Sequence, residues 1–220
     1  MNAWVGAVLV TAGAASAAWG GVDPGKPTAP RTEFAAPAAG TYQLQRIQST
    51  ADAELLDASG RSRHLSEFTR GKVTLLTFFY TSCQDPLGCP FGYVILSQLR
   101  ARVLADTTLR AHVRFVNVSL DPLHDTPETI RRYAAQFGTD PRFEWRFLTA
   151  SSVARLLPVL DDFGQDVGVE VDSQGRATRI LHHMLKVFLI DGQGTVREIY
   201  SLAFLQPEVM LNDIRTLALE

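Results

Sequence analysis

The sequence has little cysteine and no marked excess of charge of either sign. Only two of its 220 residues are cysteines, which excludes a scaffold held together by several disulfides, so stability must come from a buried core. Lys and Arg number 21 against 23 Asp and Glu, which leaves no basic surplus for a phosphate backbone, and nucleic acid is not expected as a partner. Hydrophobic residues make up 46% of the chain, which excludes intrinsic disorder as its main state. The cysteine pair is therefore available for redox or metal chemistry.

The first 22 residues lack charged side chains altogether. Within them, an apolar run at Trp4–Val10 is followed by small residues that end in Ala15-Ser16-Ala17. This pattern is typical of an export signal with a small-residue cleavage site, although the usual basic residues before the apolar run are missing. A retained membrane anchor stays open as the alternative, because about 20 apolar residues span a bilayer. Under either interpretation the folded part is expected outside the cytoplasm, periplasmic or anchored to the inner membrane and facing the periplasm.

The chain divides into three parts. Residues 1–19 are expected to be the export signal or membrane anchor. Residues 20–42 contain four prolines among many Ala and Gly residues, a composition typical of a linker. Residues 43–220 alternate strand and helix patterns and are expected to form one folded domain.

A strand, a cysteine-bearing loop and a helix are predicted in succession within this domain. The run Val73–Tyr80 is uninterrupted and β-rich, as in a central strand buried on both faces. Cys89-Pro90 begins a helix with apolar residues at helical spacing, expected to end near Ala105. A second strand is expected at Val113–Val118.

Further helices follow the second strand. Thr126-Pro127 caps and opens a helix expected to end at Gly138, and Pro207 opens a C-terminal helix. Helical periodicity at Ser151–Leu160 predicts another helix, which Pro158 should end or kink.

Turn residues predict two hairpins, one after Leu55-Leu56 and one joining Leu185–Ile190 to Thr195–Tyr200. The order of these elements along the chain indicates the fold. A strand running into a cysteine at a helix start, a β-α unit, a hairpin and a final helix predict an α/β, thioredoxin-like fold with a central mixed sheet flanked by helices. Chemistry is expected at the carboxyl ends of its strands, where both cysteines fall.

The two cysteines bracket a loop containing Pro and Gly. The segment reads Tyr80-Thr81-Ser82-Cys83-Gln84-Asp85-Pro86-Leu87-Gly88-Cys89-Pro90. Helix N-terminal amides and the helix dipole stabilise a thiolate, so at least Cys89 is expected to ionise more readily than a free cysteine. Five residues separate the pair, so the loop must bulge if the sulfurs are to meet. A permanent structural disulfide remains open beside redox and metal chemistry.

Three motifs in order resemble the Sco/SenC family over roughly residues 43–215. They are Gly71-Lys72 through Cys83 with Cys89-Pro90, then Val118–Glu128, then His183 followed by Phe188-Leu189-Ile190-Asp191. The resemblance implies a thioredoxin-like fold and a copper ion, Cu(I) or Cu(II), bound by Cys83, Cys89 and His183. The donor chemistry agrees, since soft thiolates favour Cu(I) and imidazole suits copper in either oxidation state.

The same resemblance implies an extracytoplasmic metallochaperone. Family members serve in assembly of the binuclear copper centre of cytochrome c oxidase, or act as thiol-disulfide proteins. A copper-accepting subunit of a respiratory oxidase is therefore one expected partner. A thiol reductase is the other, because an exported cysteine pair oxidises unless a reductase acts on it.

The sequence departs from the family pattern near the expected ligands. The family usually places three residues between its cysteines and an Arg where this chain has His124. His182 lies next to the expected ligand, so both extra imidazoles are alternative ligands or solvated surface groups. Met184 also carries a soft sulfur of the kind that binds copper, but it is expected in the core, because strand alternation would point it away from the face that carries His183.

Two carboxylates of the second motif have two interpretations. Asp121 and Asp125 flank Pro122 and precede a predicted helix, where a carboxylate is favourable. They are alternatively supporting groups that orient the histidine or a partner.

Functions other than that of a metallochaperone also stay open as alternatives. A thiol-disulfide oxidoreductase needs Cys83 and Cys89 as a redox pair and no metal. An electron-transfer or sensing protein is not separated from the copper carrier by the sequence. A peroxidase is disfavoured, because Tyr80 stands where such enzymes place a threonine. An ordinary thioredoxin is disfavoured too, since its two-residue cysteine spacing is absent.

Overall fold

The structure is a computed structural model that describes residues 35–220. The expected signal or anchor at residues 1–19, and residues 20–34 of the expected linker, lie outside the described residues. Among residues 35–220, no helix has both the length and the apolar character needed to cross a membrane.

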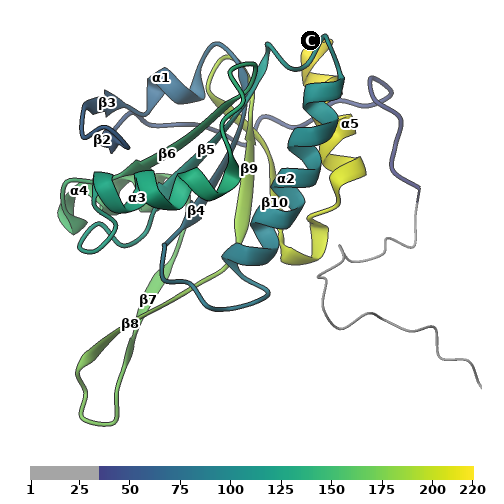
Figure 1. Ribbon diagram of the computed structural model, residues 1–220. Helices are drawn as coiled ribbons and strands as arrows, with labels where there is room; N and C mark the ends of the chain where they lie inside the picture. The colour runs from purple at the N-terminus through teal and green to yellow at the C-terminus, as the bar shows by residue number, and fades with distance from the viewer. Residues whose placement is uncertain (1–34) are drawn as a thin grey trace, which may run out of the picture.

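A mixed sheet of eight strands forms the centre of the molecule (Figure 1), in the order β1-β10-β9-β4-β5-β6-β2-β3. The neighbours β4, β5 and β6 run parallel, and every other neighbouring pair in this sheet is antiparallel. The strands are β1 (Gln48–Ser49), β2 (Glu54–Asp57), β3 (Ser62–His64), β4 (Val73–Phe79), β5 (Val113–Ser119), β6 (Glu144–Thr149), β9 (Lys186–Ile190) and β10 (Thr195–Ser201).

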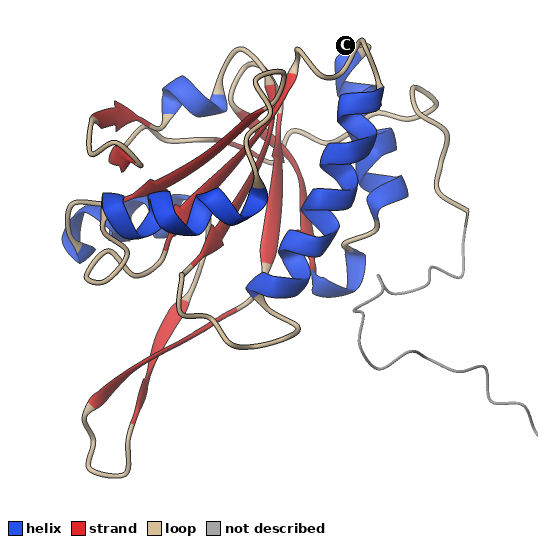
Figure 2. Ribbon diagram, in the orientation of Figure 1, coloured by secondary structure: helices blue, strands red, loops and turns tan. Residues whose placement is uncertain are grey.

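Helices cover both faces of this sheet (Figure 2). The helical elements are α1 (Ser66–Thr69), α2 (Cys89–Ala105), α3 (Pro127–Ala134), α4 (Val153–Asp162) and α5 (Pro207–Ala218), with short 3-10 turns at Ala135–Phe137 and Leu202–Phe204. On one face α2 packs beside α5, and Tyr93 of α2 contacts Tyr133 of α3. On the other face Phe163, at the end of α4, packs edge-on against Phe78. This confirms the thioredoxin-like α/β prediction.

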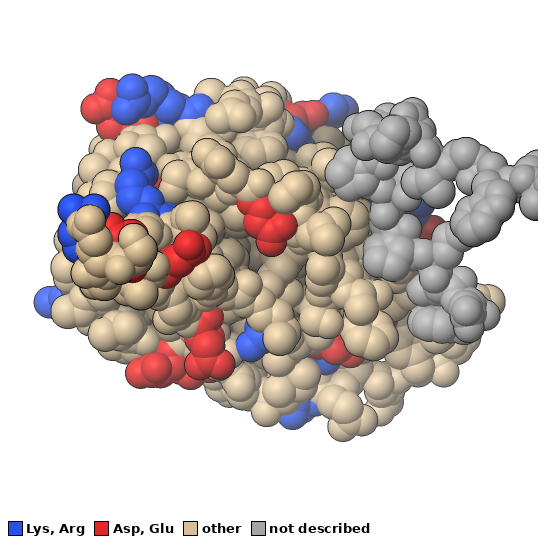
Figure 3. Space-filling model, turned by 90° about the horizontal axis from the view of Figure 1, so that it is seen from below, with Lys and Arg blue, Asp and Glu red and all other residues tan. Residues whose placement is uncertain are grey.

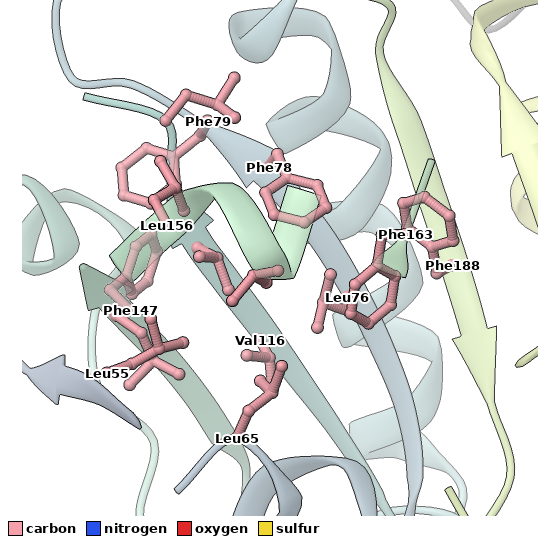
Figure 4. Packing of buried hydrophobic residues seen from close by; sticks show 14 of the residues in the cluster. Leu55, Leu65, Leu76, Phe78, Phe79, Val116, Phe147, Leu156, Phe163 and Phe188 are labelled. Atoms are coloured by element: carbon pink, nitrogen blue, oxygen red, sulfur yellow. The ribbon is translucent and has the colours of Figure 1, made fainter. Parts of the chain in front are cut away.

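All seven residues of β4 are buried, as expected of a central strand. Successive side chains point to opposite faces, so Phe79 contacts Tyr93 of α2 while Phe78 contacts the α4 side. Figure 4 shows the aromatic group on the α4 side, in which Phe78, Phe163 and Phe188 meet with ring centroids 4.9 to 6.2 Å apart. Because β4 is fixed from both faces, the loop that follows it starts from a rigid support.

The predicted helix boundaries are largely confirmed. Helix α2 runs from Cys89 to Ala105, and Thr126 caps α3 by accepting a hydrogen bond from the backbone N–H of Thr129. The expected break at Pro158 is wrong as a helix end, because α4 continues to Asp162. Burial of Val159 and Leu160 in the core compensates for the single hydrogen bond that the proline removes.

A second, two-stranded sheet formed by β7 (Val167–Val171) and β8 (Ala177–His183) was not predicted. This hairpin leaves the body of the molecule at the end where the β4–α2 loop lies (Figure 1). Most of its residues are exposed or half-buried, so it lacks the apolar pattern that reveals a core strand. His183 is the last residue of β8. Two residues separate it from Lys186, where the chain enters β9 of the main sheet.

Candidate functional site

The cysteine loop occupies residues 80–88, between the carboxyl end of β4 and the start of α2. It contains two turns: the backbone N–H of Cys83 donates to the carbonyl of Tyr80 at 3.2 Å, and that of Gly88 donates to the carbonyl of Asp85 at 3.0 Å. The Asp85 side chain also accepts from the N–H of Leu87 at 3.0 Å. These turns produce the bulge that the five-residue spacing requires.

Cys83 of this loop and Cys89, the first residue of α2, are in hydrogen-bonding contact, and neither forms a disulfide. The hydrogen bond from Cys89 lowers the pKa of Cys83 to about 5, helped by the backbone N–H groups of Cys89 and Asp85 and by the Tyr80 hydroxyl, against the opposing effect of burial. The same bond and deep burial raise the pKa of Cys89. The expectation that Cys89 ionises more readily is therefore wrong. Cys83 accepts hydrogen bonds from backbone N–H groups at and just before the start of α2, while the Cys89 side chain is buried.

Tyr80 links the cysteine loop to the β7–β8 hairpin. Its side chain is buried, and its hydroxyl is hydrogen-bonded to Cys83 and to the backbone of Leu181 on β8. Burial, followed by the charge and hydrogen bond of Cys83, raises the pKa of Tyr80 to about 12, so the hydroxyl keeps its proton at neutral pH. The sequence assigned Tyr80 no role at the site. A hydroxyl-bearing aromatic residue three positions before a cysteine was the available signal.

His183 presents a free ring nitrogen at this same place. Its Nδ1 lies 3.4 Å from the carbonyl oxygen of Leu181, which favours the tautomer with the proton on Nδ1. Its Nε2 is buried and has no hydrogen-bond partner within residues 35–220. Burial lowers the pKa of the ring, so the imidazole is neutral at pH 7 and Nε2 carries a lone pair. A buried lone pair without a donor suits a metal ion.

Packing between α2 and the segment after β8 holds His183 near the cysteines. Gly92 faces Leu185, and a Cβ at Gly92 would lie 3.3 Å from Cδ1 of Leu185. The absence of a side chain at Gly92 thus permits close packing just two residues after His183 and one turn of helix after Cys89.

A cleft of about 1270 Å³ joins these parts. Cys83 and His183 both line it, whereas Cys89 lies beneath and is 3% exposed. Within residues 35–220, no group of three or more His, Cys, Asp or Glu side chains is arranged to hold a metal ion. Seen from this end of the molecule, the surface consists mostly of uncharged side chains, with acidic and basic groups scattered among them (Figure 3). The site is thus a thiolate and a neutral imidazole on the lining of one cleft, with the imidazole Nε2 itself buried, and not a closed three-ligand cage.

Met184 lines this cleft as well and is 61% exposed. Its expected burial in the core is therefore wrong. The strand alternation that predicted burial ends at His183, so it does not apply to the following residue.

The two carboxylates of the second motif do not contact His183 in the hydrogen-bond network of the described chain. Asp125 is buried and accepts hydrogen bonds from the N–H and hydroxyl of Thr81 and from the hydroxyl of Ser119. It therefore anchors the start of the cysteine loop to β5. Asp121 instead contacts Nδ1 of His124 at 2.8 Å.

The extra histidines each have a carboxylate partner. His124 contacts Asp121, and Nε2 of His182 lies 3.3 Å from Glu170 on the neighbouring strand. His182 also lines the cleft, whereas His124 does not. Only His183 of these three has a buried ring nitrogen without a partner.

The family model for SCO1/SenC proteins matches residues 43–219. The chain belongs to the SCO1/SenC family. No curated protein matches the sequence. Two similar solved structures hold copper: ScoI of Bradyrhizobium japonicum is 25% identical, with a TM-score of 0.60 over 76% of this chain and 97% of its own. ScoI of Arabidopsis thaliana is 18% identical, with a TM-score of 0.63 over 76% of this chain and 96% of its own.

A third SCO1/SenC relative, BsSco, is 20% identical, with a TM-score of 0.63 over 81% of this chain and 98% of its own. BsSco is a member of the Sco family of cytochrome c oxidase assembly proteins, and a disulfide switch has been identified in it. The fold and family expected from the three sequence motifs are thereby confirmed.

Proposed function

We propose that this SCO1/SenC protein is an extracytoplasmic copper metallochaperone that binds one copper ion through Cys83, Cys89 and His183. The observation that carries the proposal is the placement of an ionised Cys83 and the unpartnered Nε2 of His183 on one cleft. Two soft sulfurs and one imidazole suit copper, and Cu(I) in particular. Copper bound to two relatives of the same fold supports the choice of metal.

Each ligand contributes a different step to copper uptake. Cys83 is already a thiolate at neutral pH and has no proton to lose. Cys89 holds its proton in the absence of metal, so copper binding releases that proton to solvent. His183 is neutral and offers Nε2 while Nδ1–H stays directed at the carbonyl of Leu181. Uptake of copper is therefore expected to release about one proton at pH 7.

The open arrangement of the ligands suits a carrier. Cys83 and Cys89 already touch, but Cys89 lies beneath the cleft lining and no three-ligand group is preformed within residues 35–220, so the ligand set is completed only when the ion binds. A site that is not preformed gives up its metal by ligand exchange more readily than a closed cage does. Leu87 and Ile180 expose apolar side chains on the cleft lining, which favours contact with a protein partner.

The partner that we propose is the copper-accepting subunit of a respiratory oxidase such as cytochrome c oxidase. The membership of BsSco in a family of oxidase assembly proteins supports this choice. The protein is expected to work in the periplasm or on the periplasmic face of the inner membrane. A thiol reductase is a second partner, since both sulfurs must be reduced to bind copper.

A thiol-disulfide oxidoreductase is the second candidate function, and the asymmetry of the two thiols favours it. The Cys83 thiolate would attack a substrate disulfide and form a mixed disulfide, releasing one substrate thiolate. Cys89, after losing its proton, would attack Cys83, form the internal disulfide and release the second substrate thiolate. Copper plays no part in this reaction.

Metal analysis of freshly reduced protein separates the two candidates. The wild-type protein is expected to retain one copper per chain, and the double variant Cys83→Ala, Cys89→Ala none. A wild-type protein that retains no copper but reduces a model disulfide would support the oxidoreductase instead. An internal disulfide with a potential below about −300 mV would favour a permanent structural bond over both.

A further inference from the structure

Met184 is placed where its sulfur has no structural task. The side chain is 61% exposed, so it contributes little to the core. Its backbone, by contrast, is fixed, because the Gln165 side-chain amide donates to the Met184 carbonyl at 3.2 Å. The next residue, Leu185, is buried against Gly92 of α2. A flexible, exposed thioether is thus attached to a well-held stretch of chain.

The position of this thioether relates it to the expected copper ligands. Met184 follows His183 directly and lines the same cleft as Cys83. The cleft contains no ready group of three His, Cys, Asp or Glu ligands within residues 35–220, and Cys89 is buried below its surface. An ion arriving from solvent therefore meets the Cys83 thiolate and the Met184 thioether before it can reach Cys89 or the buried Nε2 of His183.

Thioether sulfur is a soft ligand that selects Cu(I), like thiolate but without a charge or a proton to lose. We propose that the Met184 thioether is a copper(I) ligand at the mouth of the cleft, where it receives the ion with Cys83 before His183 and Cys89 bind. The inference rests on the proposed copper function. The thioether adds a neutral ligand whose binding needs no loss of a proton and which dissociates more readily than a thiolate. Both properties suit uptake and release of copper.

The other exposed apolar residues of the cleft provide the comparison. Ile180, on the same hairpin, also lines the cleft and is 48% exposed, but its side chain has no donor atom. If Met184 served only as an apolar contact for a partner, the two residues would behave alike toward copper. If Met184 is a ligand, only its replacement changes copper binding.

Methyl NMR of methionine tests the inference directly. The reduced full-length protein is labelled with carbon-13 at its methionine methyl groups and titrated anaerobically with Cu(I). The signal lost in Met184→Leu identifies Met184. We expect that signal to shift within the first equivalent of Cu(I), while Met210, which is 0% exposed in the core, does not.

Competition with a chromophoric Cu(I) chelator supplies the second readout. Met184→Leu is expected to bind Cu(I) about tenfold more weakly than wild type, a change of about 1.4 kcal/mol, whereas Ile180→Leu is unchanged. An unshifted Met184 signal with wild-type affinity in Met184→Leu would overturn the inference while leaving the copper function intact. A wild-type protein that takes no Cu(I) from the chelator would overturn both.

Discussion

The ring of Tyr80 lies edge-on to the imidazole of His183, with centroids 5.8 Å apart and planes inclined by 72°. The hydroxyl of the same tyrosine is hydrogen-bonded to Cys83. One buried side chain therefore touches two groups that are 100 positions apart in sequence. Tyr80 is a positioning residue: it holds the β8 strand over the cysteine loop and stabilises the charge on Cys83.

Replacing Tyr80 by Phe separates these two roles. The variant keeps the ring beside His183 but loses the hydrogen bond to Cys83. We expect the pH of half-maximal alkylation of Cys83 to rise by about one unit, because a hydrogen bond to a charged group contributes about 1.5 kcal/mol. The alkylation rate measured against pH tests this. A pH profile unchanged in Tyr80→Phe would contradict the assigned hydrogen bond. Tyr80→Leu removes the ring as well, so we expect it to bind copper more weakly than Tyr80→Phe does.

The two cysteines should differ sharply in reactivity. With a pKa of about 5, Cys83 is a thiolate above pH 6, and its fraction ionised falls about tenfold per pH unit below 5. Iodoacetamide at pH 6 is therefore expected to modify Cys83 and leave Cys89 untouched, as read by peptide mass spectrometry. In urea both cysteines should react equally slowly at that pH. A Cys83 rate that keeps rising up to pH 8 or 9 would show an ordinary thiol.

This asymmetry marks the limit of what the sequence could predict at the site. The strand, the helix start at Cys89 and the bulging loop follow from local patterns at Val73–Phe79 and Pro90. Which thiol ionises depends instead on the direction of the hydrogen bonds and on depth of burial. Both are set by tertiary packing, so the assignment to Cys89 from the helix dipole alone was wrong.

Gly92 is predicted to be intolerant of larger side chains. A valine there would press on Leu185, which is already 3.3 Å from the position of a Cβ, and should destabilise the fold by about 1 to 3 kcal/mol. Urea unfolding measures the loss. Adding Leu185→Ala to Gly92→Val is expected to cost less than the sum of the two single changes, because the smaller side chain makes room. Simple additivity would show that the two residues do not pack together.

Asp125 should matter for the stability of the cysteine loop. Asp125→Ala leaves the N–H of Thr81 and the hydroxyls of Thr81 and Ser119 without their acceptor, at a cost of about 3 kcal/mol in the free energy of unfolding. The exposed Asp161 on α4 serves as the control, and Asp161→Ala is expected to change stability by less than about 0.5 kcal/mol. Equal effects of the two substitutions in urea unfolding would contradict the anchoring role.

The β7–β8 hairpin, and with it the exposure of Met184, could not be predicted from the sequence for a different reason. Its strands β7 and β8 pair with each other and not with the main sheet, and they carry exposed residues on both sides, so no burial pattern identifies them. Strand alternation was consequently extended past His183, and Met184 was wrongly assigned to the core. His183 itself was found through the resemblance to a family, since a lone histidine carries no local signal.

The central claim is that sulfur and imidazole from distant segments bind one copper ion. Competition with a chromophoric chelator measures the Cu(I) affinity of the reduced wild-type protein and of His183→Ala. His64→Ala is the matched control, because His64 is exposed and paired with Asp52 outside the cleft. We predict one Cu(I) per chain, a loss of affinity of about 10-fold to 100-fold in His183→Ala, and none in His64→Ala. Wild-type affinity in His183→Ala would contradict the account and leave only a dithiol.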